Sequence, residues 1–572
     1  HTGLRLPIVN DEKWVTVGDR SRHAIAIGNL LQNKVTERLY CLWYTREDAG
    51  YPGKGGWVVR TVHNPWATGT NAVVLAGSDA VGTEHAVGAF LRILDDLPGT
   101  TVPHTVTVAL GEAMKTHFSK PNPSATRKRL PRYSQRSLMS GSADLGMRYV
   151  YTGNPDWGED LLVRLREHRR RGNPGHDTHM ELWKTLRGWD NIEESPALTE
   201  EVRLEVTNYL LQVLRGKEGV FSGMFQSSLS YEAVRHNHEM LAAMDAYYGW
   251  LYFGRYYDLP DADDWLAKAR YCFGAQEQHF KGKDESGNYE ATAALWPLLS
   301  YAIAEPGYTF LPSGVGRTFI DRCVITLDNR FSLSGHGDCW DTDCFAPLTF
   351  AIGAWYYRDS GYQYVLEEHY RLRPERSLVF RTYPTFAMHG VLQPERPARF
   401  EGVTVAPLDP GHYAYYREHQ DELLWNTPVT NTFDKLSLRT RFEPDAQYLL
   451  LDGIACGSHG HADPNCIARF TDNGRVWIVD DCYTEGPFLD AQNGIQVTRN
   501  GLGAPLPACA RLDGKADFSH AGLTRTTLVD HAGTDWERNI LWLKEGPVLI
   551  LDRLTAREDA TFGIRLRWRT LG

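Results

Sequence analysis

Two histidines, His459 and His461, stand one residue apart in the segment 457–463 (GSHGHAD) and are the side chains of this chain best suited to chemistry. If the segment is extended, both imidazoles point to one face, because strand side chains alternate with a period of two. Imidazoles titrate near neutral pH and often bind metals, so the pair suits proton transfer or metal binding. The alternative interpretation is that both are ordinary loop residues at the end of a strand.

A β-hairpin is predicted directly after these histidines. The runs 466–470 and 475–479 flank Asn473-Gly474, the strongest short-range turn signal. Such a hairpin would fold Asp480 back toward His461, so that an imidazole and a carboxylate meet. That pairing suits a borderline cation such as zinc and leaves His459 for proton chemistry.

A second motif lies upstream, in the segment 236–240 (HNHEM), where a long helical pattern begins. Asn237 is an uncharged donor that can bind a carboxylate, and His238 can take or give a proton near neutral pH. Both motifs therefore fit chemistry on an acidic substrate.

Three regions must position these motifs. Residues 1–105 predict a small accessory α/β unit, with strands at 57–62 and 72–77 and a helix at 82–94. Residues 106–390 carry amphipathic helical patterns and favour an α/α toroid, an incomplete barrel of helical hairpins; examples are 159–166, 199–215, 237–257 and 265–279. Residues 391–572 carry short strands with Gly, Asp and Asn turns and favour an antiparallel β-sandwich. The predicted fold class is multidomain α+β.

The two motifs, in this order, resemble the signature of the heparinase II/III-like polysaccharide lyases; alginate lyases of related fold and dermatan sulfate epimerase are similar. The resemblance covers roughly residues 110–572 and implies that the two motifs face each other across one cleft. It further implies an enzyme that cleaves uronic-acid polymers by β-elimination. Such a reaction needs a base for the C5 proton, a group that neutralises the carboxylate, and an acid at the leaving oxygen.

The resemblance also implies roles for individual residues. It assigns Asn237, His238 and His459 to catalysis. The family's catalytic tyrosine corresponds to the stretch 284–296, where the positions after Glu290 hold alanines and depart from the family pattern. We therefore choose Tyr289, with Tyr301 and Tyr483 in reserve. Substrate binding is predicted for Arg235, Glu290 and Trp296.

A structural metal ion is implied as well. The families use a histidine well downstream of the aspartate, which gives His461, Asp480 and His520 as ligands, with His531 as the alternative third ligand. Zinc is the predicted ion, since manganese and calcium are less natural partners for two imidazoles.

Composition narrows the classes of partner. The chain of 572 residues has a net charge of −10, so it has no global basic field for nucleic acid, and no apolar run is long enough to span a bilayer. The basic clusters 127–136 and 164–171 could attract an acidic polymer, or could be solvated helix faces. The nine scattered cysteines contain no C-x-x-C pair, which argues against a thiolate zinc site or a disulfide framework.

Three other functions stay open at this point. A glycoside hydrolase needs two carboxylates, for which Glu290, Asp338 and Asp341 are candidates. A uronyl C5-epimerase shares the proton abstraction, and a non-catalytic glycan-binding protein would use the abundant aromatic side chains. We expect a secreted or periplasmic protein acting on glycosaminoglycans or alginate, although no signal segment is visible. The particular polymer and the oligomeric state are not encoded in these motifs.

Overall fold

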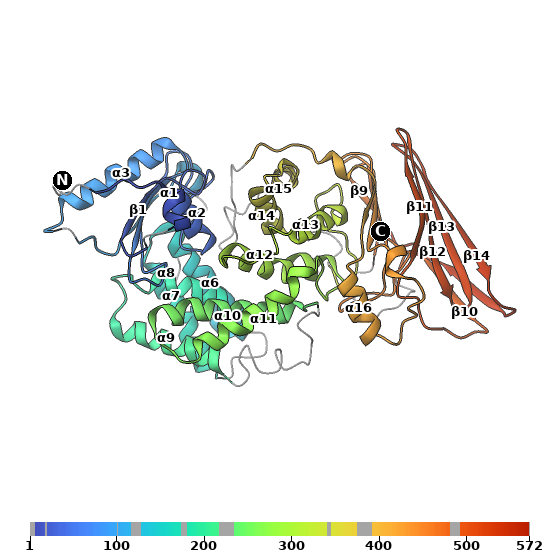
Figure 1. Cartoon of the computed structure of the whole chain (residues 1–572), viewed down its shortest axis with the longest axis horizontal. Helices are drawn as coiled ribbons and strands as arrows, with labels where there is room; N and C mark the ends of the chain where they lie inside the picture. The colour runs from blue at the N-terminus through green and yellow to red at the C-terminus, as the bar shows by residue number, and fades with distance from the viewer. Residues whose placement is uncertain are drawn as a thin grey trace.

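A computed structural model of the chain describes residues 6–17, 20–99, 101–115, 127–172, 180–216, 234–339, 345–373, 392–480 and 492–570. The elements run from an α/β layer through a set of helices to antiparallel sheets (Figure 1). The predicted α+β class is therefore confirmed, whereas the domain boundaries at 105 and 390 stay predictions. No helix within these ranges combines the length and apolar character needed to cross a membrane.

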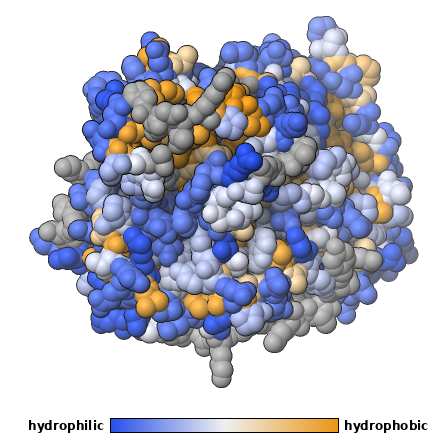
Figure 2. All heavy atoms as spheres, turned by 60° about the vertical axis from the view of Figure 1, so that its left-hand side comes forward, coloured by the Kyte–Doolittle hydropathy of each residue, from blue (hydrophilic) through white to orange (hydrophobic). Residues whose placement is uncertain are grey.

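The N-terminal layer is a four-stranded sheet of order β1-β3-β2-β4. Strand β1 (Ala24–Ile27) is parallel to β3 (Ala72–Gly77), and β2 (Trp57–Val62) is antiparallel to both β3 and β4 (Val106–Ala109). Helix α3 (Ala80–Asp95) packs on β2 and β3, while α1 (Asp11–Val17) and α2 (Lys34–Cys41) precede them in the chain. The predicted strands and helix are confirmed. Figure 2 turns the left-hand side of Figure 1 toward the viewer, and the surface seen there is mostly hydrophilic with scattered apolar patches.

The middle of the chain is helical and is built from neighbouring pairs, such as α6 with α7, α10 with α11 and α14 with α15. The helices are α6 (Gln135–Thr152), α7 (Asp156–Arg170), α8 (Leu182–Ile192), α9 (Glu200–Arg215), α10 (Asn237–Tyr256), α11 (Ala262–Ala275), α12 (Leu295–Ala304), α13 (Val315–Thr326), α14 (Pro347–Tyr357) and α15 (Ser360–Leu372). One continuous apolar core joins them to α2 of the N-terminal layer. This large shared core holds the loops between the helices in fixed positions.

The C-terminal region contains two facing antiparallel sheets. One has the order β5-β6-β7-β8-β9 and the other the order β11-β12-β13-β14, and apolar side chains from both form one core. The strands are β5 (Gly402–Ala406), β6 (Lys435–Arg439), β7 (Tyr448–Asp452), β8 (Ile467–Asp472), β9 (Arg475–Val479), β10 (Ile495–Arg499), β11 (Arg511–Asp517), β12 (Ala521–His531), β13 (Thr534–Leu543), β14 (Val548–Ala556) and β15 (Phe562–Leu566). Helix α16 (Pro410–His419) lies between β5 and β6 in the chain. The predicted β-sandwich is confirmed.

The predicted hairpin is formed by β8 and β9, and its turn is the expected one. Asn473 and Gly474 have φ values of 52° and 72°, the left-handed conformation that a tight hairpin turn requires. All seven described cysteines are buried. Cys344 and Cys482 lie outside the described residues.

Candidate active site

The loop that carries His459 and His461 is a turn, which agrees with the second of the two interpretations that the sequence left open. His459 has a φ of 62°, in the left-handed region. The loop is held against the residues before α12, because Glu285 N–H donates to Ser458 O (2.6 Å) and Ser458 N–H donates to Lys283 O (3.0 Å). This pairing between distant segments fixes the turn, and no local pattern encodes it.

Both imidazoles nevertheless converge on one carboxylate, that of Asp338. His459 Nδ1 lies 2.9 Å from Asp338 Oδ2, and His461 Nε2 lies 3.1 Å from Asp338 Oδ1. Because a carboxylate only accepts, Nδ1 of His459 carries the proton in this contact, and neutral His459 has its lone pair on Nε2. Gly337 allows the approach, since it has a φ of 60° and a Cβ there would lie 2.0 Å from the carbonyl oxygen of Glu285.

The second motif forms the N-terminus of α10, which His236 caps. His236 N–H donates to the carboxylate of Glu239 (3.1 Å), and His238 N–H approaches His236 Nδ1 (3.2 Å), which makes a capping box. The backbone N–H of Asn237 donates to Asp284 Oδ2 (2.9 Å). A carboxylate at this end of a helix is favoured by the unpaired N–H groups there.

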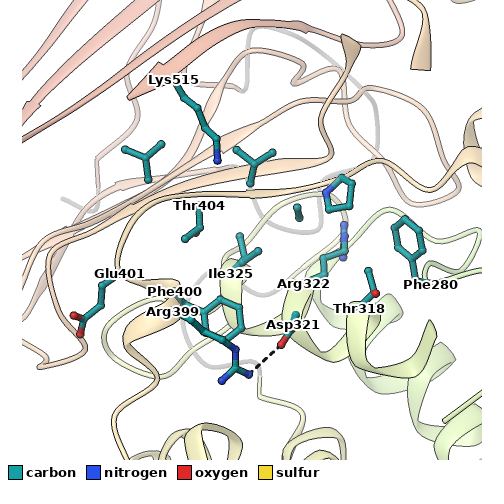
Figure 3. Close-up of a pocket in the computed structure, with 14 residues that line it drawn as sticks. Phe280, Thr318, Asp321, Arg322, Ile325, Arg399, Phe400, Glu401, Thr404 and Lys515 are labelled. Atoms are coloured by element: carbon teal, nitrogen blue, oxygen red, sulfur yellow. Dashed lines mark hydrogen bonds and ion pairs between the residues drawn. The ribbon is translucent and has the colours of Figure 1, made fainter. Parts of the chain in front are cut away.

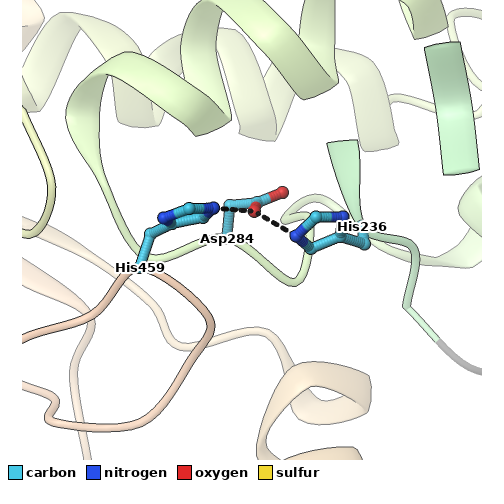
Figure 4. A group of neighbouring side chains, drawn as sticks. All are labelled: His236, Asp284 and His459. Carbon is cyan, nitrogen blue, oxygen red and sulfur yellow. Dashed lines mark ion pairs between the residues drawn. The ribbon is translucent and has the colours of Figure 1, made fainter. Parts of the chain in front are cut away.

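A row of four rings runs across the junction between the two motifs. His238 stacks on His236 with centroids 5.1 Å apart, His236 lies 5.9 Å from His459, and His459 stacks on Tyr289 at 3.8 Å with an interplanar angle of 7°. Asp284 Oδ1 lies 3.2 Å from His236 Nε2 and 3.7 Å from His459 Nε2, and both imidazoles point at this carboxylate (Figure 4). The side chains of His236 and His459 are 25% and 24% exposed, so this group is open to small or flexible ligands.

Burial controls protonation in this row. Desolvation raises the pKa of Asp284 to about 8, against the hydrogen bond from Asn237 N–H, which lowers it. Desolvation, reinforced by neighbouring His238 and His459, lowers the pKa of His236 to about 3. At neutral pH the contact between His236 and Asp284 is therefore mainly one between uncharged groups.

The remaining predicted residues are more deeply packed. Arg235 is buried, with its guanidinium 4.9 Å from the ring centroid of Tyr271. Trp296 is half-buried and lies edge-on to Trp183 at 6.3 Å. Glu290 is buried and its carboxylate pairs with Arg322. The reserve tyrosine Tyr301 is also a core residue, and Tyr483 lies outside the described residues.

Glu290 belongs to a buried charge network at the junction of the helical and β regions. The network joins three cations to four carboxylates: Lys281, Arg322, Lys435, Glu285, Glu290, Asp434 and Asp452. Desolvation raises the pKa of Glu290 to about 7, although Arg322 and Lys281 lower it. These pairs link α13 to β6 and β7 and so hold the two halves of the site in register.

The predicted metal ligands do not come together. His461 faces Asp338, and the amide of Gln492 lies between it and Asp480, 3.4 Å from His461 Nδ1 and 3.0 Å from Asp480 Oδ2. His520 is exposed at the turn between β11 and β12, while the alternative, His531, is buried beside Ile495 O (2.9 Å). Among the described residues, the side chains that could share a metal are instead His236, Asp284 and His459, whose ligand atoms all lie within 4.8 Å of one another. This corrects the predicted ligand set.

A separate cavity of about 450 Å³ lies between α13 and β5. Lys515 and Arg399 line it, with Arg322 reaching from its wall into the buried network (Figure 3). None of the stacked rings lines this cavity. The candidate site is therefore the group of partly exposed rings around the buried Asp284, outside this cavity.

Sequence reasoning missed three side chains of this site: His236, Asp284 and Asp338. His236 was visible as part of the helix-start motif, and Asp338 only as a carboxylate for a hydrolase. Asp284 follows two lysines in a polar stretch, and such stretches are usually solvated. Only the contacts with α10 and the histidine loop distinguish it.

The fold and the site together define an α/β, helical and β-sandwich protein with a histidine- and carboxylate-lined surface between its helical and β regions. No family model matches the chain, and no curated protein matches its sequence. Among solved structures it is similar to a heparan sulfate lyase from Pedobacter heparinus (13% identity, TM-score 0.42, 74% of this chain and 62% of that one). It is also similar to a heparinase III, with 12% identity and a TM-score of 0.48 over 84% of this chain and 77% of that one. A further heparinase III has 11% identity and a TM-score of 0.46 over 84% of this chain and 76% of that one. The chain thus spans 62% of the length of the Pedobacter lyase.

Proposed function

We propose that this protein is a polysaccharide lyase that cleaves a uronic-acid-containing polymer by β-elimination. The observation that supports it best is the stacked row His238, His236, His459 and Tyr289, beside Asn237 at the start of α10. His238 and Tyr289 offer a base and a phenol at a partly exposed surface, and Asn237, which is buried directly beside His238 in the chain, offers an amide donor. These are the three groups that elimination needs.

In the proposed reaction, His238 removes the C5 proton of the uronate. The electron pair of the broken C5–H bond forms the C4–C5 double bond, and the C4–O bond breaks. The leaving oxygen takes the proton of the Tyr289 hydroxyl, so no water is consumed. Asn237 donates a hydrogen bond to the uronate carboxylate, where negative charge develops.

His459 has a supporting role in this mechanism. Its Nδ1–H donates to Asp338, which fixes the ring orientation and keeps the lone pair on Nε2. Its stacking on Tyr289 at 3.8 Å holds the phenol against the same surface. His459 can therefore accept the proton that His238 has gained and pass it to the Tyr289 phenolate, which restores both groups after each turnover.

The substrate class follows from the uronate requirement. Heparan, chondroitin and dermatan sulfates, hyaluronan and alginate all contain a uronate next to the bond that breaks. Three arginines in and directly after α7 do not select among them, because Arg166 pairs with Glu205 (2.7 Å) and Arg170 and Arg171 pair with Glu167 (both 2.8 Å). We propose a secreted or periplasmic enzyme with regions 1–105, 106–390 and 391–572.

The carboxylates named for a hydrolase have other partners. Glu290 pairs with Arg322 inside the buried network, and Asp338 contacts two imidazoles. Asp341 lies outside the described residues. This favours elimination over hydrolysis, whereas an epimerase shares the removal of the C5 proton and differs only in the later step, in which a proton returns to C5.

The test is the ultraviolet absorbance of the unsaturated uronate, measured on each of these polymers. We expect a signal on one polymer class that is lost in His238→Ala and kept in His85→Ala, a control at an exposed position of α3. Absence of signal on every polymer, or equal rates for wild type and His238→Ala, would refute the proposal. Exchange of the C5 proton without absorbance would indicate the epimerase instead.

A further inference from the structure

The three groups that meet at Asp284 have the composition of a metal site. His236 Nε2 and His459 Nε2 approach the same oxygen, Asp284 Oδ1, at 3.2 and 3.7 Å (Figure 4). Zinc bonds of about 2.0–2.1 Å in a tetrahedron put neighbouring ligand atoms about 3.3–3.5 Å apart. The two separations at Asp284 are close to these values, and the ligand atoms of all three residues lie within 4.8 Å of one another.

Asp284 Oδ1 supplies a second, independent observation. It is buried and makes no hydrogen bond, whereas Oδ2 accepts from Asn237 N–H. Buried carboxylate oxygens normally have a partner, since an unsatisfied one costs about 1–3 kcal/mol or more. The Nε2 atoms of both imidazoles face this oxygen at 3.2 and 3.7 Å without forming a hydrogen bond to it, an arrangement that suits three ligand atoms around one cation.

The outer partners of the two histidines also fit. Asp338 accepts from His459 Nδ1, which is the carboxylate–histidine arrangement that orients metal-binding imidazoles and leaves the Nε2 lone pair for the ion. In the capping box His236 Nδ1 accepts from His238 N–H at 3.2 Å, so binding an ion through Nε2 moves the ring proton to Nδ1. His238 N–H then keeps its closer acceptor, Asn237 Oδ1 (2.8 Å).

We propose that His236, Asp284 and His459 bind one divalent transition-metal ion of the zinc class, with an open fourth position. Two imidazoles and one carboxylate favour such an ion over calcium or magnesium, which prefer sets of oxygen ligands. No ligand of this site belongs to the sequence-predicted trio, and the site lies within the row of rings.

The site has a consequence that rests on the proposed function. The Nε2 lone pair of His459 cannot bind a metal and accept a proton at once. The ion also occupies the surface where the uronate must lie beside Asn237. Metal binding and elimination are therefore mutually exclusive, and zinc is an inhibitor of the lyase.

The direct test is calorimetric titration of the chelator-treated full chain with zinc chloride. We expect one equivalent to bind, with a rise in Tm because the ion binds only the folded state. His236→Gln and Asp284→Asn should weaken binding at least tenfold, and His520→Gln, an exposed control, should not. Circular dichroism checks the fold of each variant. The visible spectrum of the cobalt-loaded protein shows whether nitrogen and oxygen or buried thiolates bind the ion.

The outcomes separate the two proposals. No binding, unchanged affinity in both site variants, loss in His520→Gln alone, or a thiolate spectrum would overturn the metal site. One equivalent of zinc without activity on any polymer would leave the metal site supported and the lyase refuted. In an active enzyme, zinc should abolish turnover and chelator should restore it; a rate that zinc leaves unchanged or increases would overturn the inhibition.

Discussion

The buried carboxylate of Glu193 makes stability depend on pH in a calculable way. Glu193 ends α8 and accepts from Tyr252 OH (2.6 Å), Tyr257 OH (3.2 Å) and Thr207 Oγ1 (3.3 Å). Desolvation raises its pKa to about 7 from the ordinary 4.5, although the hydrogen bond from Tyr252 lowers it. A carboxylate whose pKa is raised on folding destabilises the folded state once it ionises.

The magnitude follows from the pKa difference. Below pH 4.5 the group is protonated in both states and makes no difference to stability. Between pH 4.5 and about 7 the unfolded chain loses the proton and the folded chain keeps it, so stability falls as pH rises. At 1.36 kcal/mol per pKa unit the total loss is about 3 kcal/mol, fully present above pH 7.

The assay is denaturant unfolding of wild type and Glu193→Gln at several pH values from 4 to 8. Other buried carboxylates also titrate in this range, so the quantity to follow is the difference between the two proteins. The stability of Glu193→Gln relative to wild type should rise by about 3 kcal/mol from pH 4.5 to pH 7.5. A difference that stays constant with pH would refute the reasoning.

Three further predictions concern the site and its supports. Asp338→Asn should lower kcat on the polymer about 10²- to 10⁴-fold with little change in KM, because the imidazole loses its orienting carboxylate; an unchanged kcat would argue against this positioning role. Arg322→Met leaves buried carboxylates unpaired and should lower the free energy of unfolding in urea by about 3–5 kcal/mol. The control Arg371→Met, at an exposed pair, should lower it by less than about 1 kcal/mol. Equal losses would show that the network adds no stability. Gly337→Ala should lower the free energy of unfolding by about 1–3 kcal/mol and reduce activity, since its Cβ would meet a backbone oxygen at 2.0 Å. Gly501→Ala is the control, because Gly501 also has a positive φ but a Cβ there would have nothing within 4 Å. An equal loss of stability in both variants would assign the cost to φ alone.

Much of the fold could be predicted because its signals are local. The period of apolar residues indicates α10, and Asn473-Gly474 indicates the β8–β9 hairpin, since each pattern reports the geometry of neighbouring residues. At His459 the sequence left an extended segment and a loop equally open, and the structure has a turn. The turn there depends on hydrogen bonds to residues more than 170 positions away in the chain.

The candidate site shows the same division at the level of side chains. The sequence by itself determined which residue types were available: an Asn-His pair at a helix start, an H-x-H loop and a tyrosine before Glu290. Only the tertiary structure decided that Asp284 and Asp338, rather than Asp480, face these imidazoles, and that His520 lies exposed on the turn between β11 and β12. The physical reason is that the site joins loops from the helical and β regions. Their relative position is set by the shared core and the buried charge network, neither of which is readable from residues close in sequence.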